Sequence, residues 1–473
     1  MLRKLLSHAA IYGLAAQLPR VAGVLALPII TPYLTTTDYG VAGVVTAYVT
    51  ALGMVQSLGL SVVMVNAFVK HPTRYKWVWR QVGGLMSVWS FVFGVALASV
   101  LCLGIPNEAG ENKWAIIVLN CLPVMLFAGT ELQTNLFYQL SQRPLTVAVR
   151  SLIVGVVSVG FNVYTIAFLQ LGYMGWFYAS FIAAFTGFAI NFNSIYLKEE
   201  LWPILKLNRN KWKSWLRISL PVVPHQLSFF VLDTSDKLML NWLGMPIKQI
   251  GNYNLASNFG SYYMTVSGAI VQASSPFYMS LYAQNNSIDA AYQVRRLTFA
   301  LQILFLVTTT AICIWMKEIF ELLIQNVVLQ QAYPLAIIIL MAYNFRPMYL
   351  AVVNWLTLRE YTGKLWRISL VAGLSNVVLN LVFIPWFGYE AAAFTTFVCF
   401  MYMGYAGYFI QEFRQSVPVN FYPFFWFILT VIALLLAYYM SDSSINYKIV
   451  TSTVLGLIGV VSGIILKKKA ASP

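Results

Sequence analysis

Charged side chains are scarce in this 473-residue chain: Asp, Glu, Lys and Arg together make up 10% of it, whereas apolar residues make up 59%. Soluble globular proteins carry roughly 25% charged residues. The shortage excludes a single water-soluble domain, because apolar runs recur from one end of the chain to the other. We predict an all-α polytopic membrane protein.

Cysteine and histidine are also rare, with four Cys and three His. Each Cys stands alone inside an apolar run, so a disulfide framework and a zinc site are both excluded. His225 is typical of a packed histidine, and its role stays open. Long loops and a Gly-rich phosphate motif are lacking too, so we expect no enzyme, metal or cofactor. A polytopic lipid-modifying enzyme is the remaining enzymatic alternative.

Apolar stretches long enough to cross a bilayer fill most of the chain. A spanning helix needs about 20 mostly apolar residues. We predict fourteen spans, at 7–33, 40–68, 82–104, 114–139, 146–170, 174–196, 215–243, 251–283, 298–323, 332–356, 367–387, 391–412, 422–440 and 447–466.

The net charge of +15 is concentrated in alternate links between these spans. Cytoplasmic loops of membrane proteins carry an excess of Lys and Arg. The pattern predicts a membrane protein with both termini in the cytoplasm, the first apolar run being an uncleaved span. It forms no basic groove for nucleic acid. The basic links contain Lys70, Arg74, Lys76, Arg80, Arg143, Lys198, Lys206, Arg209, Lys211, Lys213, Arg295, Arg296, Arg359, Lys364 and Arg414.

A weak internal repeat relates the two halves at offsets of about 211 to 218 residues. Arg150, Asn162 and Gly172-Tyr173 correspond to Arg367, Asn380 and Gly388-Tyr389, and Asp38-Tyr39-Gly40 corresponds to Gln249-Ile250-Gly251. An even number of spans between the repeats makes them parallel. We predict an N-terminal six-helix lobe (1–197), a basic cytoplasmic linker (198–214), a C-terminal six-helix lobe (215–413) and a terminal helix pair with a basic tail (414–473). The Trp-rich linker suits the headgroup region of the membrane.

Several charged side chains lie inside predicted spans, where each costs at least about 2.5–3.5 kcal/mol and indicates function by default. Asp233 and Lys237 stand four residues apart in the order that favours an ion pair within a helix. That pair is either static or part of the site. Asp236 then needs another partner, for which Arg20 and Arg346 are candidates. The full set is Arg20 with neighbouring Gln17, Glu131, Asp233, Asp236, Lys237 and Arg346.

Polar and proline residues mark further candidate positions. Asn254 and Asn258 begin a polar stripe on the eighth predicted span, which is typical of a cavity lining. Proline removes a backbone hydrogen bond, and helix breaks in transporters border substrate sites or hinges. Pro28 in the first span and Pro347 in the tenth are therefore candidate hinges.

Longer motifs in a fixed order carry a family resemblance. They are PIITPYL at 28–34 with DYG at 38–40, LGL at 58–60, LPVVP at 220–224 with Asp236-Lys237, GNYNLA at 251–256, and Asn380 with IPWFG at 384–388. Together they resemble the polysaccharide transporter (Wzx-type O-antigen flippase) family of the multidrug/oligosaccharidyl-lipid/polysaccharide exporter superfamily.

The resemblance implies a flippase that moves an undecaprenyl-pyrophosphate-linked oligosaccharide, such as a repeat unit of O-antigen (lipopolysaccharide) or capsule, across the inner membrane. Arg20, Lys237 and Arg346 would bind the pyrophosphate, because guanidinium groups grip phosphate bidentately. Partners would be the glycan lipid, membrane lipids and the polymerase and chain-length proteins of glycan assembly. The alternatives are a multidrug cation antiporter and a lipid II flippase.

Energy coupling is expected at acidic side chains, because no nucleotide-binding motif is present. Asp233, Asp236 and Glu131 are the candidate carboxylates for binding a proton or sodium, with the membrane potential as a further source of energy. The identity of the glycan, the coupling ion and the oligomeric state do not follow from the sequence.

Overall fold

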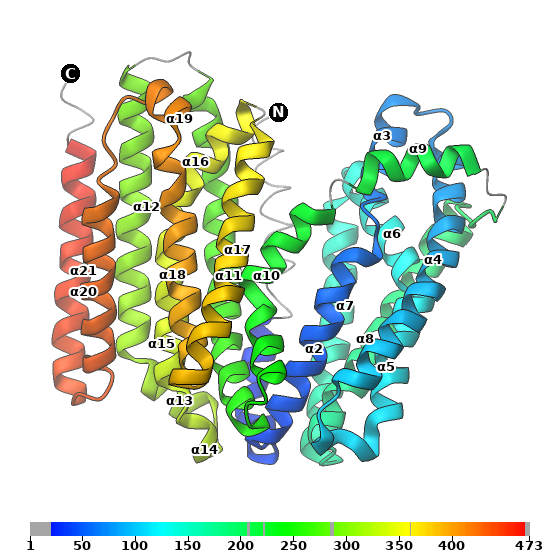
Figure 1. Ribbon diagram of the computed structural model, residues 1–473, viewed down its shortest axis with the longest axis horizontal. Coiled ribbons are helices and arrows are strands. Elements are labelled where there is room, and N and C mark those ends of the chain that lie inside the picture. The colour runs from blue at the N-terminus through cyan, green and yellow to red at the C-terminus, as the bar shows by residue number, and fades with distance from the viewer. Residues whose placement is uncertain (1–19, 206–208, 221–222, 284–287, 360, 469–473) are drawn as a thin grey trace. The chain divides into compact units, whose positions relative to one another are not determined.

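The computed structural model describes residues 20–468 apart from 206–208, 221–222, 284–287 and 360 (Figure 1). Throughout these residues the regular elements are helices, and no strand occurs among them. The predicted all-α class is therefore confirmed.

The chain divides into two compact units. Unit 1 holds the chain up to Phe230 together with Pro246–Gly251, and unit 2 holds Val231–Met245 and the chain from Asn252 onward. The boundaries predicted after residues 197, 214 and 413 stay predictions.

Unit 1 begins with a helix over Arg20–Tyr33, which ends in the 3-10 turn η1 (Thr31–Tyr33). Its other helices are α2 (Thr36–Gln56), α3 (Ser61–Lys70), α4 (Tyr75–Gly104), α5 (Lys113–Leu126), α6 (Ala128–Leu140), α7 (Pro144–Val163), α8 (Tyr173–Phe192) and α9 (Arg209–Ser219). Short η segments cover Asn107–Asn112, Tyr164–Phe168 and Asn193–Lys198.

Two helices, α10 (Val223–Trp242) and α11 (Ile247–Tyr282), contribute residues to both units. The remaining helices of unit 2 are α12 (Ile288–Ile314), α13 (Met316–Leu323), α14 (Val327–Gln330), α15 (Tyr333–Ala342), α16 (Arg346–Leu358), α17 (Thr362–Phe387), α18 (Ala391–Tyr405), α19 (Gln411–Ser416), α20 (Pro423–Met440) and α21 (Ile445–Lys468). Short η segments cover Tyr343–Phe345 and Ala406–Phe409.

Nine helices among the described residues are long and apolar enough to cross a membrane, or ten if the bent pair α5–α6 is one span. Each of these ten falls on a predicted span. The other four predicted spans fall on the helix over Arg20–Tyr33, on the polar helices α10 and α11, and on the 15-residue α18. The count of fourteen therefore stays a prediction.

Some of the prolines lie at helix breaks, whereas others lie within continuous helices. The turn Tyr343–Phe345 separates α15 from α16, and Pro347 lies in the first turn of α16, where its missing N–H costs nothing. This is the break expected there. Pro28 instead lies within the helix over Arg20–Tyr33, and α11 continues through Pro276.

Two glycines at corresponding repeat positions make similar turns. Gly172 has φ +54° and precedes α8, whereas Gly388 has φ +78° and separates α17 from α18. Only glycine adopts such values without strain. Helix α7 packs on α8, and α17 packs on α18. The two helical hairpins thus have the same construction, as the internal repeat predicts.

A second corresponding pair, Gly40 and Gly251, allows close backbone packing inside unit 1. A Cβ atom added to Gly40 would lie 2.2 Å from the carbonyl oxygen of Ile247, and one added to Gly251 would lie 1.8 Å from that of Thr36. Helix α2 and the first turn of α11 therefore meet where no side chain fits.

The terminal pair α20–α21 packs on α12. Lys448 of α21 is 1% exposed and donates hydrogen bonds to Glu318 of α13 and to the carbonyl oxygen of Ser441 at 2.7 Å. Lys317 forms an exposed ion pair with Asp442 at 3.0 Å. These polar contacts join the loop between α20 and α21 to α13.

Candidate functional site

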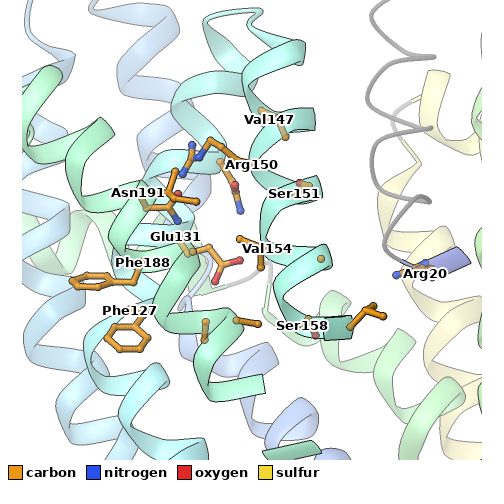
Figure 2. A pocket seen from close by; sticks show the side chains of 17 residues that line it. Arg20, Phe127, Glu131, Val147, Arg150, Ser151, Val154, Ser158, Phe188 and Asn191 are labelled. Carbon is orange, nitrogen blue, oxygen red and sulfur yellow. The ribbon is translucent and has the colours of Figure 1, made fainter. Parts of the chain in front are cut away.

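A cavity of about 430 Å³ opens inside unit 1, lined mainly by helices α6, α7 and α8 (Figure 2). Arg20 and Glu131, two of the charged residues singled out in the sequence, both line it. The lining residues are Arg20, Phe127, Glu131, Asn135, Val147, Arg150, Ser151, Val154, Gly155, Ser158, Val159, Ala183, Ala184, Gly187, Phe188, Ile190 and Asn191.

The polar groups are unevenly distributed around this cavity. Figure 2 shows Glu131, Arg150 and Asn191 grouped on one side, from α6, α7 and α8 respectively, whereas Arg20 lies apart from them. Glu131 is exposed, Arg150 is half-buried and Asn191 is 6% exposed. Three helices therefore converge on one polar cluster within an otherwise apolar bundle.

Arg150 is held in place but retains hydrogen-bonding capacity. Its guanidinium carbon lies 5.0 Å from the centroid of the Tyr138 ring, which is cation–π range. Its buried Nε finds no hydrogen-bond partner among the described residues. Arg150 also lines the cavity, and a guanidinium group can bind phosphate or carboxylate oxygens through parallel hydrogen bonds. The cavity thus carries two arginines against one carboxylate, and the excess suits an anionic group.

A separate buried polar network surrounds Asp236 of α10 in unit 2. Asp236 is 2% exposed. Its Oδ1 accepts a hydrogen bond of 2.7 Å from Asn380 Nδ2, and its Oδ2 accepts one of 2.7 Å from Thr396 Oγ1. The hydroxyl of Tyr253 in α11 also donates to Oδ2. The carboxyl group is therefore held by three neutral donors from three helices.

Further amide and hydroxyl groups complete this network. Asn376 accepts from Asn380 Nδ2 at 3.1 Å and donates to Thr396 Oγ1 at 3.1 Å, while Thr395 donates to the Asn380 carbonyl oxygen. Asn376 and Asn380 are both 0% exposed. Burial of a carboxylate without a cation is costly unless it is neutralised. The side-chain oxygens gathered here make this a place where a proton or small cation can be held.

The surroundings of Asp236 differ from the sequence expectation, which gave it Arg20 or Arg346 as a partner. Its hydrogen-bonding partners named above are neutral because α17 and α18 of unit 2 present amides and hydroxyls to it. Arg346 instead lies with its guanidinium carbon 5.3 Å from the centroid of the Tyr343 ring, and Arg20 lines the unit 1 cavity.

The structure places the other predicted residues as follows. Lys237 and Asn258 are half-buried, and Asn254 is 6% exposed. Gln17 lies outside the described residues, as do the side chains of Asp233 and His225, so the proposed Asp233–Lys237 pair stays a prediction. Within the described part of the chain, no group of three or more His, Cys, Asp or Glu is arranged to hold a metal ion.

Sequence reasoning missed Arg150 as a site residue and used it only to mark the repeat. Its signal was present, because it is an arginine inside the fifth predicted span. The contributions of Tyr253, Asn376 and Thr396 had no comparable signal, because neutral polar residues are common in spans.

Helices long and apolar enough to cross a membrane, a polar cavity within one unit and a buried carboxyl network in the other are the features of a multi-pass membrane protein. The sequence model of the polysaccharide biosynthesis protein family matches residues 5–281, more than half of the chain. The chain belongs to this family. Among curated proteins, none matches it.

Solved structures show the same fold. The chain is similar to the lipid II flippase MurJ in an inward closed conformation, with a TM-score of 0.67 at 12% identity over 97% of this chain and 98% of that one. It is similar to an inward-facing multidrug resistance MATE family transporter of the MOP superfamily (TM-score 0.60, 14% identity, 86% and 94% coverage). It is also similar to a mutant of the Vibrio cholerae MATE transporter VcmN, with a TM-score of 0.51 at 18% identity over 89% of this chain and 99% of that one. The family is thus that of polysaccharide biosynthesis proteins, and the fold is that of MurJ and of MATE transporters.

Proposed function

We propose that this protein is a flippase for an undecaprenyl-pyrophosphate-linked oligosaccharide, such as an O-antigen or capsule repeat unit. It would carry this lipid across the bacterial inner membrane by alternating access, with both termini in the cytoplasm. The observation that carries the proposal is the polar cavity of unit 1, in which Arg20 and Arg150 outnumber the single carboxylate of Glu131. Membership of a polysaccharide biosynthesis family supports the glycan as cargo.

The cavity suits the head of such a lipid. Arg150 offers a guanidinium group for phosphate oxygens, and Asn135, Asn191 and Ser151 offer groups that hydrogen-bond to sugar hydroxyls. Phe127 and Phe188 add aromatic faces, stacked with centroids 4.6 Å apart. The polyprenyl tail is apolar and stays in the lipid. Arg346 and Lys237 of unit 2 remain candidates for the same phosphate at another stage of transport.

Coupling is proposed at Asp236, by binding of a proton or sodium to the buried carboxyl network. A bound proton or sodium ion neutralises the Asp236 carboxylate, whereas without the ion the carboxylate remains as a buried negative charge. Moving one charge through the full potential supplies about 2.3 kcal/mol per 100 mV, which shifts a two-state equilibrium roughly fiftyfold. Glu131 and Asp233 are weaker candidates, because Glu131 is exposed and the side chain of Asp233 lies outside the described residues.

The alternatives predict different cargo. A multidrug cation antiporter requires an acidic cavity, and the two arginines of the unit 1 cavity oppose a cationic drug. A lipid II flippase would share the pyrophosphate site and differ in the glycan that it accepts, and the fold similarity to MurJ keeps this alternative in place.

The test is reconstitution of the purified full-length chain in proteoliposomes. Vesicles would hold either an undecaprenyl-pyrophosphate oligosaccharide or lipid II on one leaflet, and a sugar-modifying enzyme added outside would report arrival on the other. We expect transfer of the oligosaccharide lipid to exceed transfer of lipid II.

Ethidium efflux driven by a proton gradient provides the competing measurement in the same vesicles. Ethidium efflux without transfer of the glycan lipid would overturn the proposal in favour of the drug antiporter. Faster transfer of lipid II than of the oligosaccharide lipid would overturn it in favour of peptidoglycan precursor transport. Protein-free vesicles supply the background rate.

A further inference from the structure

Helix α9 (Arg209–Ser219) presents a fixed basic face on unit 1 that neither the cavity nor the Asp236 network uses. The helix packs on α3. In Figure 1 it runs crosswise to the long helices at one end of its unit. Its sequence RNKWKSWLRIS alternates cations with large apolar side chains at helical spacing. Such a helix is typical of the plane of a membrane interface.

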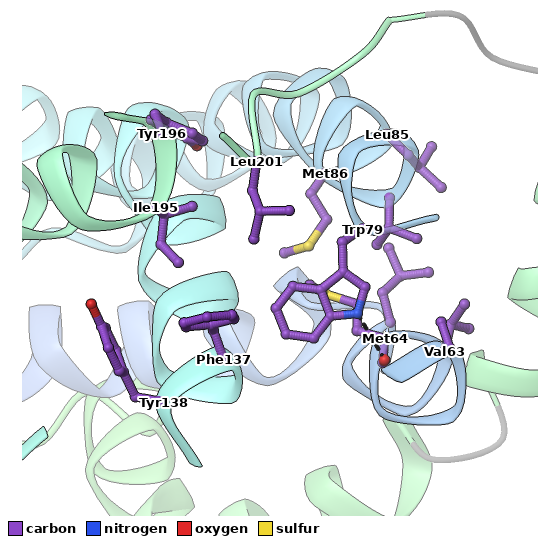
Figure 3. Packing of buried hydrophobic residues seen from close by; sticks show 13 residues of the cluster. Val63, Met64, Trp79, Leu85, Met86, Phe137, Tyr138, Ile195, Tyr196 and Leu201 are labelled. Carbon is purple, nitrogen blue, oxygen red and sulfur yellow. Dashed lines mark hydrogen bonds between the residues drawn. The ribbon is translucent and has the colours of Figure 1, made fainter. Parts of the chain in front are cut away.

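The apolar face of α9 is anchored in the unit. Trp212 and Trp215 pack against the hydrophobic cluster shown in Figure 3, whose centre is the fully buried Trp79. Trp79 is itself fixed, because its Nε1 donates to the carbonyl oxygen of Met64 at 2.9 Å. The orientation of α9 about its own axis is therefore set by packing.

The segment before α9 is fixed as well. The carbonyl oxygen of Trp202 accepts a hydrogen bond of 3.0 Å from Arg80 Nε, and the N–H of Ile204 donates to the Arg80 carbonyl oxygen at 2.9 Å. A Cβ atom on Gly84 would lie 2.1 Å from the carbonyl oxygen of Ile204, so this segment lies directly on α4.

The opposite face of α9 carries the charge. Lys213 and Arg217 are four residues apart and therefore point the same way. Both are exposed, and among the described residues neither forms an ion pair. Exposed apolar side chains flank them, namely Leu205 (66% exposed), Ile218 (50%) and Leu220 (45%). Cations bordered by exposed apolar groups match a lipid headgroup above an acyl chain.

We propose that the α9 face (Lys213 and Arg217) is a docking surface for anionic phospholipid headgroups of the leaflet on the Lys- and Arg-rich side of the membrane. Charge complementarity selects anionic over zwitterionic headgroups, and the flanking apolar side chains select a lipid over a soluble acidic protein. Because α9 is fixed to α3 and α4, lipid bound there holds one end of unit 1 at the membrane surface.

Spin-labelled phosphatidylglycerol and phosphatidylcholine are the probes, each added to the purified full-length chain in phosphatidylcholine nanodiscs. The protein-immobilised fraction of each label gives its relative affinity. Lys213→Gln with Arg217→Gln should lower the preference for phosphatidylglycerol by roughly fivefold per cation at low salt, with a smaller change at high salt. The substituted residues are exposed, so folding should be retained.

Two matched variants complete the experiment. Lys113→Gln with Lys248→Gln removes the same charge from other parts of unit 1 and should leave the preference unchanged. Lys213→Arg with Arg217→Lys keeps the charge and should also leave it unchanged. An unchanged preference in the Lys213→Gln/Arg217→Gln variant, or an equal loss in the Lys113→Gln/Lys248→Gln variant, would overturn the proposal. Loss of a co-purifying acidic protein with lipid preference intact would replace the lipid by a protein partner.

Discussion

Asn380 of α17 donates a 2.7 Å hydrogen bond to the carboxyl group of Asp236 in α10, and both side chains are buried. The two residues are 144 positions apart in the chain. Their contact joins the repeat-marking asparagine of the eleventh predicted span to a carboxyl group in the seventh. Substitutions of this pair can therefore test whether the carboxyl group of Asp236 has a structural or a functional role.

Asp236→Asn should abolish ion-coupled transport while the protein still folds. Asparagine keeps the size of the side chain, and its NH2 group can donate to the Thr396 and Tyr253 hydroxyls, but it cannot take up a proton or offer a charge. The exchange of the pair, Asp236→Asn with Asn380→Asp, returns a carboxyl group to the network and should restore part of the activity. The measurement is glycan-lipid transfer in proteoliposomes between about pH 5 and 8, with and without sodium. Normal transfer by Asp236→Asn under all these conditions would exclude the coupling role.

Arg150→Ala should reduce transfer of the glycan lipid severely at near-normal protein abundance, because it removes the guanidinium on the polar side of the unit 1 cavity. Arg150→Lys should recover only part of the rate, since an ammonium group is a point charge without bidentate geometry. Arg20→Ala and Arg346→Ala test the other two arginines in the same assay. The control is Arg414→Ala, an exposed arginine away from this cavity. Wild-type transfer by all three cavity and span variants would contradict a cationic substrate site.

Gly251→Ala should destabilise unit 1 by roughly 1–3 kcal/mol, the usual cost of overpacking. The new Cβ would lie 1.8 Å from the Thr36 carbonyl oxygen, so helix backbones must move apart. Gly456→Ala is the matched control, because nothing lies within 4 Å of its Cβ position, and alanine there should be neutral or stabilising by up to about 1 kcal/mol. Thermal unfolding in detergent compares the two. Equal midpoints would show that the close approach is not required.

The ion pair between Lys317 and Asp442 lies outside the apolar helices of the structure, although Lys317 falls in the predicted span 298–323, and it gives a pH prediction. The hydrogen bond from Lys317, followed by that from Tyr333, holds the pKa of Asp442 below its ordinary value. A lowered folded-state pKa stabilises the protein above the ordinary pKa of about 4 and loses this effect as the pH falls through the lowered value. Asp442→Asn should cost roughly 0.2–1 kcal/mol at neutral pH, because the side chain is 61% exposed.

The difference between wild type and Asp442→Asn should disappear as the pH falls through the lowered pKa of Asp442. Thermal midpoints across the acid range measure it, with Glu111→Gln as an exposed carboxyl control. A constant difference at every pH would show that the charge of Asp442 contributes nothing.

Reporter fusions test the orientation of the spans. Fusions after Asn107 and Ser443 should report the outer side, and fusions after Arg74 and Ala471 the inner side, because Lys and Arg concentrate in alternate links. An inner-side signal at Ser443 would remove the last helix pair from the fourteen-span topology.

The sequence was sufficient to predict the class of fold and to identify the charged residues that lie inside the predicted spans. Apolar periodicity alone predicted helices where α4, α12 and α20 lie, because a membrane helix satisfies its own backbone within one local segment. The cost of charge in lipid identified Arg20, Glu131 and Asp236, all of which the structure places in a cavity or a network.

The partners of these residues were not predictable, because they depend on packing between distant segments. Thr396 lies 160 residues from Asp236 and is one of many hydroxyls in apolar helices. Nothing local to Thr396 or Tyr253 indicates a bond to a carboxyl group. The partner of Asp236 was sought among arginines, whereas several neutral donors share that role in the structure. Arg150 shows the opposite case, in which the local signal existed but its cavity became visible only with α6 and α8 in place.

Phe230 and Val231 are consecutive residues of α10 that belong to different units. An α-helix is a regular, rigid structure. Each residue inserted into it therefore rotates the following part of the helix by about 100° and shifts it by about 1.5 Å along the axis. Length changes inside α10 should therefore be far less acceptable in evolution than length changes in a loop, and natural variation in the length of this protein should accumulate elsewhere. We therefore expect α10 to be constrained in its length as well as in its sequence.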